Sequence, residues 1–215
     1  MLLELKNISK SFDDAAVLSG VSLALDRGQS VAIVAPSGAG KSTLLSIAGL
    51  LYAQTSGQVL IDGADAAMLS DDEQSALRAQ KIGFLFQHTQ LVGTLTAAEN
   101  AALPADFTKG AAAKSDAEVD ERARRMLADF GLGERLDYLP SQLSVGQKRR
   151  VATARALFND PALIIADEPT NDLDAENSAR VVDALFARVA TGDAGLLIAT
   201  HDQDLAARAD TIVVL

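Results

Sequence analysis

A segment of small residues at positions 35–43 follows an apolar run at residues 31–34 and precedes two leucines. This order predicts a strand, a loop and then a helix. Such a loop leaves backbone N–H groups free to point inward, and the helix that follows adds the positive end of its dipole, so a polyphosphate fits there. The segment therefore constrains the chain to a βα unit built around a phosphate cradle. Its predicted binding residues are Pro36, Ser37, Gly38, Ala39, Gly40, Lys41, Ser42 and Thr43.

Lys41 would reach the β and γ phosphates of a nucleotide, and Ser42 would place its hydroxyl on Mg²⁺. The usual pattern of such loops, G-x-x-x-x-G-K-[ST], has glycine where this chain has Ala35. Ala35 costs little if its φ is negative and is strained if its φ is positive. The alternative interpretation of the segment is an ordinary Gly/Ser turn before an amphipathic helix.

Two adjacent acids, Asp167 and Glu168, follow a short apolar run at residues 162–166. The run predicts a buried parallel strand, and ligands of open α/β sheets bind at the carboxyl ends of the strands. Asp167 can then hold Mg²⁺ through water, and Glu168 is placed to polarise a water that attacks the γ phosphate. Acids at a strand end can also cap the next helix, and the pattern leaves this alternative open.

Residues 143–147, Leu-Ser-Val-Gly-Gln, precede a helical run that extends to Leu157. Ser144 and Gln147 have the spacing of a capping box, so the segment by itself predicts an ordinary helix start. An exposed helix N-terminus with Ser and Gly is also a γ-phosphate site. With the phosphate loop and the acid pair, the segment resembles the signature loop, usually Leu-Ser-Gly-Gly-Gln, of the ATP-binding cassette (ABC) ATPases. The order of motifs matches that family across the whole chain.

The resemblance implies an ATPase that uses ATP and Mg²⁺ and forms a head-to-tail homodimer around two ATP molecules. Each signature loop then completes the site of the opposite subunit, where Ser144, Gly146 and Gln147 would contact ATP. Val145 stands where the family commonly has its first glycine, whereas Gly146, the glycine that approaches phosphate, is present. Val145 therefore affects the expected geometry of the dimer around ATP, but not the resemblance to the ABC ATPases.

Gln87 and His201 each follow an apolar run, at residues 82–86 and 196–200. Gln87 resembles the family's Q-loop glutamine, which touches Mg²⁺ and the attacking water and senses the membrane partner. His201 resembles the switch histidine that contacts the γ phosphate, and the carboxyl end of a strand in this topology lies in the ligand crevice. Without the resemblance, a glutamine here is usually a solvated turn residue and a lone histidine is usually structural.

Asp174 and Phe12 are the remaining residues that match the family's sites. Residues 171–174 occupy the D-loop position, where Leu173 and Asp174 match. Asp174 can equally be the N-cap of the next helix, and the two roles are compatible. Phe12 resembles the aromatic residue that stacks on adenine, although a phenylalanine in a short N-terminal segment can also cover the edge of a core.

The composition fits a cytosolic enzyme domain. The length of 215 residues favours one domain with an inserted lobe. The chain has no cysteine, which excludes disulfides and thiolate metal sites. Its formal net charge of -10 argues against a nucleic-acid surface. No apolar stretch approaches the length of a membrane span, and Glu4 interrupts the first apolar run, unlike a signal peptide. A solvated or phosphate-facing helix surface is the expected place of the clustered bases Lys148, Arg149, Arg150 and Arg155.

We predict an α/β fold with a RecA-like P-loop NTPase core, an N-terminal antiparallel β subdomain and an inserted α-helical subdomain. Residues 1–215 form a single domain, with the core at about 1–90 and 156–215 and the helical signature subdomain at about 91–155. Alternating apolar residues in the first quarter of the chain predict the small sheet. Capping pairs that begin at Ser70 and Ser115 predict two helix starts, and residues 110–114 predict a surface loop.

Within the family, several segments resemble the ATPases that serve lipoprotein-release, macrolide-export and cell-division permeases. The implied function is a transport motor in which ATP binding closes two copies and hydrolysis reopens them. The partner would be a separate integral membrane permease, which would hold the chain at the inner face of the cell membrane. The segments are residues 82–87, 95–100, 103–104 and 166–170.

We expect the permease to dock near residues 87–95, where Leu91 and Val92 offer apolar side chains. The alternative is that these two side chains are simply buried. An alternative is a mechanotransmission ATPase that regulates cell-wall enzymes through a permease and moves no substrate. A translation or DNA-repair ABC protein is disfavoured because those have two fused cassettes or a long coiled coil. After residues 211–215, where this chain ends, the family usually adds a turn and one more strand.

Overall fold

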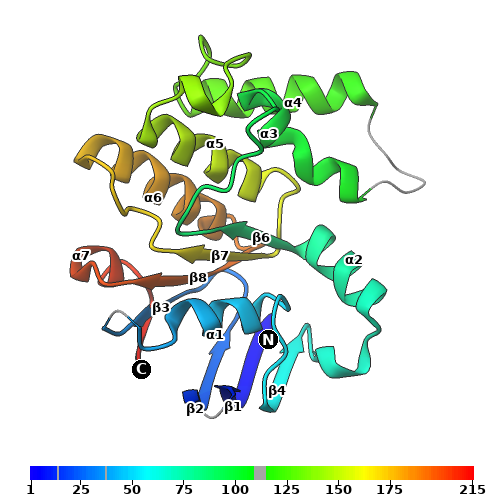
Figure 1. The fold of residues 1–215 in the computed structure, drawn as a ribbon, viewed down its shortest axis with the longest axis vertical. Coiled ribbons are helices and arrows are strands. Elements are labelled where there is room, and N and C mark those ends of the chain that lie inside the picture. Colours follow the sequence, from blue (N-terminus) through cyan, green and yellow to red (C-terminus); the bar gives the residue numbers. More distant parts are fainter. Residues whose placement is uncertain (14, 37, 109–114) are drawn as a thin grey trace.

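The computed structural model describes residues 1–13, 15–36, 38–108 and 115–215. Two β-sheets and their helices stack in layers, as Figure 1 shows. Helix α1 (Lys41–Ala48) lies between the two sheets, and α5 (Val145–Leu157) and α6 (Ala175–Ala190) cover the opposite face of the central sheet. Helices α3 (Ala97–Ala102) and α4 (Asp116–Asp129) form the outermost layer beyond α5.

The central sheet consists of parallel strands in the order β6-β7-β8-β3-β9. Strands β7 and β8 are buried almost throughout, as expected of strands covered on both faces. Because β8 lies between β3 and β7, the carboxyl ends of these strands emerge beside one another. The strands are β3 (Ser30–Val34), β6 (Ile82–Leu85), β7 (Leu163–Asp167), β8 (Gly195–Thr200) and β9 (Thr211–Val214).

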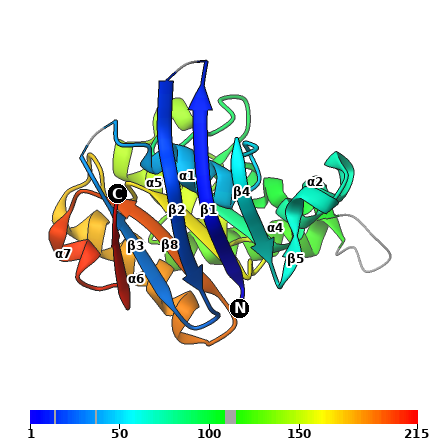
Figure 2. The same cartoon turned by 90° about the horizontal axis from the view of Figure 1, so that it is seen from below.

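The second sheet is antiparallel, in the order β2-β1-β4-β5, which confirms the predicted N-terminal sheet. Figure 2 shows its long strands lying across the face that is seen from below. Leu3 and Leu5 are buried and Glu4 between them is less so, so one face of the sheet covers a core. The strands are β1 (Leu3–Phe12), β2 (Ala15–Leu25), β4 (Ser56–Ile61) and β5 (Ala64–Asp65).

Capping boxes define the starts of several helices. Ser70 caps α2 (Asp71–Lys81) and Ser115 caps α4, which confirms both predicted starts. Thr96 caps α3 and Ser144 caps α5 in the same way. The remaining helices are α7 (Gln203–Ala206) and the 3-10 helices η1 (Ala66–Met68), η2 (Leu103–Thr108) and η3 (Pro140–Gln142).

Two hydrophobic cores lie on opposite faces of the central sheet. Alternate residues of β7 divide between them: Ile164 joins the core formed with α3 to α6, and Ile165 joins the core formed with α1 and the antiparallel sheet. The sheet is thus held from both sides, and its carboxyl edge is a fixed platform for functional groups. The surface loop predicted at residues 110–114 lies outside the described residues. Over the described ranges, no helix combines the length and apolar character needed to cross a membrane.

Candidate active site

Four strand ends of the central sheet bring the predicted catalytic and metal-binding residues to one edge. Asp167 is the last residue of β7, and Glu168 comes next. His201 follows β8 directly, and Gln87 lies two residues beyond β6. The loop between β3 and α1 completes the edge. Parallel strands place their carboxyl ends together, so this convergence follows from the strand order.

The loop between β3 and α1 has the backbone that a phosphate cradle needs. Gly38 and Gly40 have φ angles of 81° and 89°. A Cβ on Gly40 would lie 2.8 Å from Leu18 Cδ2 and 3.0 Å from the Val17 carbonyl, so both conformation and space require glycine. Ala35 is not among the described residues with positive φ, so it replaces the usual glycine without backbone strain. Ser37 lies outside the described residues.

Lys41, at the first position of α1, is buried beside the acid pair. Its Nζ donates to the Ala35 carbonyl at 2.8 Å and to the Pro36 carbonyl at 3.4 Å, and it lies 3.7 Å from Glu168 Oε1. The ammonium is thus held at the N-terminus of α1 and away from bulk water. In bulk water its attraction for phosphate would be weaker.

A cavity of about 310 Å³ opens between these groups. The cavity joins the loop, the start of α1, the Gln87 segment and the acid pair, which gives it cationic, hydroxyl and carboxylate groups. It is lined by Val17, Gly38, Gly40, Lys41, Ser42, Thr43, Gln87, Asp167 and Glu168. The sequence did not single out Val17, although it faces the loop from β2 and covers Gly40.

Burial raises the pKa of the Asp167 carboxyl, and the neighbouring Glu168 raises it further, against a hydrogen bond from Ser42 and the charges of Lys41 and Arg149. Within the described chain, Asp167 Oδ1 is buried and has no hydrogen-bond partner. Such an oxygen lacks the partner that a buried polar atom normally has. Together with the Ser42 hydroxyl it forms the oxygen set that Mg²⁺ prefers, so these residues fit that ion.

Glu168 is held by His201 on one side and Lys41 on the other. His201 Nδ1 lies 2.9 Å from Glu168 Oε2, and the His201 backbone N–H donates to the same oxygen at 3.3 Å. The Glu168 backbone has a φ of 45°, which is uncommon for a residue other than glycine, and its N–H donates to the Ala199 carbonyl. Strain of this kind persists only where the surroundings enforce one orientation of the side chain.

The signature segment forms a local helix start that does not line the cavity of its own chain. Ser144 is the N-cap of α5, and Gln147 closes the capping box. A Cβ on Gly146 would lie 2.8 Å from the Asn177 carboxamide, so the glycine allows α5 to pack on α6. Val145 is 56 % exposed. Asp174, the N-cap of α6, accepts hydrogen bonds from Asn177.

Phe12 also lies outside the cavity lining. It is 43 % exposed, its ring meets the Tyr52 ring edge-on at 6.3 Å, and the Lys10 ammonium lies 4.9 Å from its centroid. The ring is therefore available at the surface, between a second aromatic and a cation.

The prediction that the clustered bases form a solvated or phosphate-facing helix surface is wrong. Arg149 is buried, and Arg150 and Arg155 are half-buried. Arg150 donates to the Phe130 carbonyl, and the other two donate to carbonyls of the segment after β6. These carbonyls belong to loop and helix-end positions without ladder partners, so they accept from the side chains of α5.

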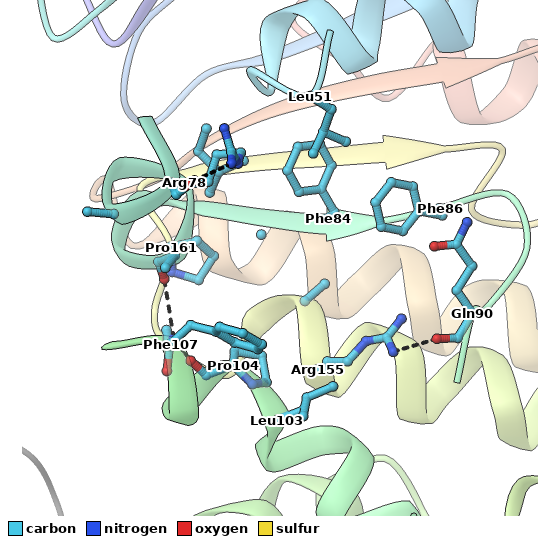
Figure 3. A pocket seen from close by; sticks show the side chains of 17 residues that line it. Leu51, Arg78, Phe84, Phe86, Gln90, Leu103, Pro104, Phe107, Arg155 and Pro161 are labelled. Atoms are coloured by element: carbon cyan, nitrogen blue, oxygen red, sulfur yellow. Dashed lines mark hydrogen bonds between the residues drawn. The ribbon is translucent and has the colours of Figure 1, made fainter. Parts of the chain in front are cut away.

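Leu91 is partly buried and packs against the core formed with α3 to α6. Val92 is exposed. A more extensive apolar surface lies beside them: a groove of about 710 Å³ bounded by α2, β6, η2 and α5 (Figure 3). Among its lining side chains are Leu51, Phe84, Phe86, Leu103, Pro104 and Phe107.

A parallel sheet whose strand ends bring together a glycine loop, its lysine and an acid pair defines a P-loop NTPase. Residues 18–171 match the family described as "ABC transporter", so the chain belongs to the ABC transporter ATP-binding family. It is an ATPase of this family, and the predicted α/β fold and ATPase class are confirmed.

Curated relatives match over nearly the full chain. The lipoprotein-releasing system ATP-binding protein LolD of Porphyromonas gingivalis is 43 % identical over 99 % of this chain and 95 % of its own length. LolD 1 of Rhodospirillum rubrum is 44 % identical over 99 % of this chain and 94 % of its own. LolD of Aquifex aeolicus is 42 % identical over 95 % and 89 %.

Solved structures agree with these relatives. A dimeric ATP-binding cassette in a post-hydrolysis state, bound to ADP and Pi, has a TM-score of 0.93 and 37 % identity, over 100 % of this chain and 94 % of that one. A dimeric structure of a bacterial ABC transporter cassette has a TM-score of 0.92 and 38 % identity over the same shares.

Proposed function

We propose that this chain is the ATPase motor of a lipoprotein-release type transporter, which works as a head-to-tail pair and drives a separate membrane permease. The strongest support is the cavity at the edge of the central sheet, where Lys41, Asp167 and Glu168 converge. The names of the relatives favour lipoprotein release over mechanotransmission. Through the permease, the chain would lie at the inner face of the cell membrane.

Glu168 acts on the attacking water in this proposal. Its carboxylate lies between His201 Nδ1 and Lys41 Nζ, so its direction is fixed before nucleotide binds. A positioned carboxylate polarises water more effectively than a mobile one, because its orientation entropy is already lost. His201 holds Glu168 and contacts the γ phosphate, while Lys41 compensates the charge of the β and γ phosphates.

Ser42, Asp167 and Gln87 would hold Mg²⁺ at the phosphates. All three residues line the same cavity, and their side chains carry hydroxyl, carboxylate and carboxamide oxygens. The described residues contain no group of three or more His, Asp or Glu side chains placed to hold a metal, so phosphate and water would complete the coordination. When bound, the ion supplies charge neutralisation at the phosphates.

The placement of Ser144, Gly146 and Gln147 supports the proposed homodimer. These residues do not line the cavity of their own chain. Ser144 and Val145 are exposed at the start of α5, whereas Gly146 is buried against Asn177 of α6. Helix N-termini favour phosphate groups, so this one is suited to the ATP held by a second copy. Asp174 lies beside it at the start of α6, and Phe12 would stack on adenine.

The apolar groove is the proposed docking site of the permease. Aromatic and aliphatic side chains converge in it, and the segment after Gln87 forms part of its wall, as Gln90 in Figure 3 shows. A large apolar groove on a chain of net charge -10 is typical of an interaction surface. In this arrangement the helical subdomain, residues 91–155, moves with the permease.

Glu168→Gln is expected to convert the chain to a stable dimer in Mg-ATP, because the amide cannot accept the proton of the attacking water and the bound nucleotide is retained. Gel filtration with Mg-ATP, at tens of micromolar protein, measures the conversion. The control is the double variant Lys41→Ala/Glu168→Gln, which should remain monomeric. A Glu168→Gln variant that binds ATP and stays monomeric would contradict the head-to-tail pair.

A further inference from the structure

Two arginines of α5 attach the segment after β6 to that helix. Arg149 Nη1 donates to the Phe86 carbonyl at 2.7 Å, and its Nη2 donates to the Gln87 carbonyl at 2.5 Å. Arg155 Nη1 donates to the Gln90 carbonyl at 2.8 Å, and its Nη2 donates to the Thr89 carbonyl at 2.7 Å. Figure 3 shows the bond between Arg155 and Gln90 at the wall of the groove.

The attached segment has no regular structure between the end of β6 and Leu91. Its carbonyls therefore lack ladder partners and need donors from elsewhere. A guanidinium offers a rigid fork of donors, so one side chain can hold two carbonyls in a fixed relative position. Arg149 and Arg155 meet this need on both sides of His88.

Arg149 is buried at a cost that packing alone does not explain. It is 3 % exposed, and within the described residues its Nε has no partner. Burial lowers the pKa of the Arg149 guanidinium, against the opposing charges of Asp172 and Asp167. An apolar side chain would fill the same space without this desolvation cost. The contacts with the Phe86 and Gln87 carbonyls are therefore the feature that requires a guanidinium.

Gln87 faces two ways. It lines the cavity together with Lys41 and Glu168, and its carbonyl accepts a hydrogen bond from Arg149. We propose that Arg149 is a positioning residue for ATP hydrolysis, which sets the place of Gln87 in the cavity from helix α5. This inference rests on the proposed role of Gln87 in the site.

The same helix begins at Ser144, the cap of the signature segment. Since Ser144 and Arg149 belong to one rigid helix, a displacement of that helix start moves the backbone of Gln87 with it. Misplacement of a reacting group by about 1 Å can cost on the order of 100-fold in rate. A role in position predicts a loss of turnover with nucleotide affinity retained.

The test is a double-mutant cycle between Arg149→Ala and Gln87→Ala, with kcat and ATP affinity measured on the full-length chain. We expect Arg149→Ala to lower kcat by about tenfold or more and to leave the ATP Kd within about twofold. In the Gln87→Ala background, Arg149→Ala should lower kcat by less than about twofold, because its effect passes through Gln87. Arg149→Lys should fall between, since an ammonium is one donor point rather than a fork.

Arg150→Ala is the matched control. Arg150 is the next residue of the same helix, yet it holds the Phe130 carbonyl at the end of α4 rather than the Gln87 segment. Any effect of Arg150→Ala on kcat should be the same with and without Gln87, as a purely structural contribution would be.

Several outcomes overturn the proposal. One is an Arg149→Ala effect that is equally large in the Gln87→Ala background. Another is a fall in ATP affinity as large as the fall in kcat, which would place Arg149 in the nucleotide cradle. Failure of both Arg149→Ala and Arg149→Lys to fold would assign it a structural role. An unchanged kcat in Gln87→Ala alone would instead refute the proposed role of Gln87.

Discussion

Lys41 shows how a single residue concentrates the electrostatics of the site. It is buried at the start of α1, where it adds a full charge to the positive end of the helix dipole. Two carbonyls and the Glu168 carboxylate surround its Nζ. In the proposed function, Lys41 would exchange these oxygens for phosphate oxygens without moving far.

Lys41→Ala should abolish measurable Mg-ATP binding, because it leaves the β and γ phosphate charge uncompensated in that cavity. Calorimetric titration of ATP measures the effect. Lys81→Ala is the control. Lys81 is the last residue of α2, forms an ion pair with Asp62 and does not line the cavity. ATP affinity in Lys41→Ala equal to that of the parent would refute this prediction.

At the scale of elements, Asn100 fixes the loop that connects the Gln87 segment to α3. It is fully buried, its Nδ2 donates to the carbonyls of Val92, Leu95 and Thr96, and its Oδ1 accepts from the Val92 N–H. One carboxamide thereby contacts four backbone groups, its two N–H groups being shared among three carbonyls, and this ties the loop to the helical layer.

Asn100→Asp is expected to lower the free energy of unfolding by about 2–4 kcal/mol, because the donors are lost and an acid oxygen faces three carbonyls. Urea unfolding followed by circular dichroism measures the loss. The same change at the exposed Asn7 should cost less than about 0.5 kcal/mol. An Asn100→Asp protein as stable as the Asn7→Asp protein would show that the loop does not depend on these bonds.

Asp210 fastens the start of β9 to β3. Hydrogen bonds from the Ser30 Oγ and backbone N–H, at 2.7 and 2.8 Å, hold the pKa of the Asp210 carboxyl below its ordinary value of 3.8. A lowered folded-state pKa stabilises the fold above the unfolded value and loses this effect as pH falls through the folded one.

Asp210→Asn should therefore lower the urea midpoint at pH 7, and the difference from the parent chain should shrink as the pH falls below about 4. Asp193→Asn is the control. Asp193 lies on the surface after α6, and its carboxylate is 4.0 Å from Arg188, so its charge should contribute little to stability. A difference that is independent of pH would show that the charge of Asp210 does not stabilise the strand.

Features that span few positions along the chain could be predicted from the sequence, and features that join distant positions could not. The strand before the phosphate loop, the sheet of the first strands and the caps at Ser70 and Ser115 are local patterns, and the structure has them. The burial of Arg149 depends on carbonyls that are 62 and 63 positions away, so its charge suggested an exposed helix face. The packing of Leu91 likewise depends on a core that is assembled from helices distant in the sequence.

At the scale of the whole molecule, the ATP cavity and the apolar groove share one segment. Gln87 lines the cavity and Gln90 lines the groove, while Arg149 and Arg155 fix the intervening backbone to α5. A partner in the groove would thus contact the same segment that, in the proposed function, presents Gln87 to nucleotide. Such a shared element allows binding at one site to change the other when the two states differ in energy.

Phe107→Asp tests the groove as the permease site. Phe107 is 69 % exposed and lines the groove from η2, so a carboxylate at this position should leave the fold intact. Burial of that carboxylate against an apolar partner would be unfavourable and should weaken binding. We expect at least tenfold less co-purification with a co-expressed lipoprotein-release type permease in detergent, with ATP affinity unchanged. Met68→Asp is the matched control, because Met68 is 81 % exposed and lies outside the groove. If Phe107→Asp and Met68→Asp retain the permease equally, the permease docks elsewhere and the groove has another occupant.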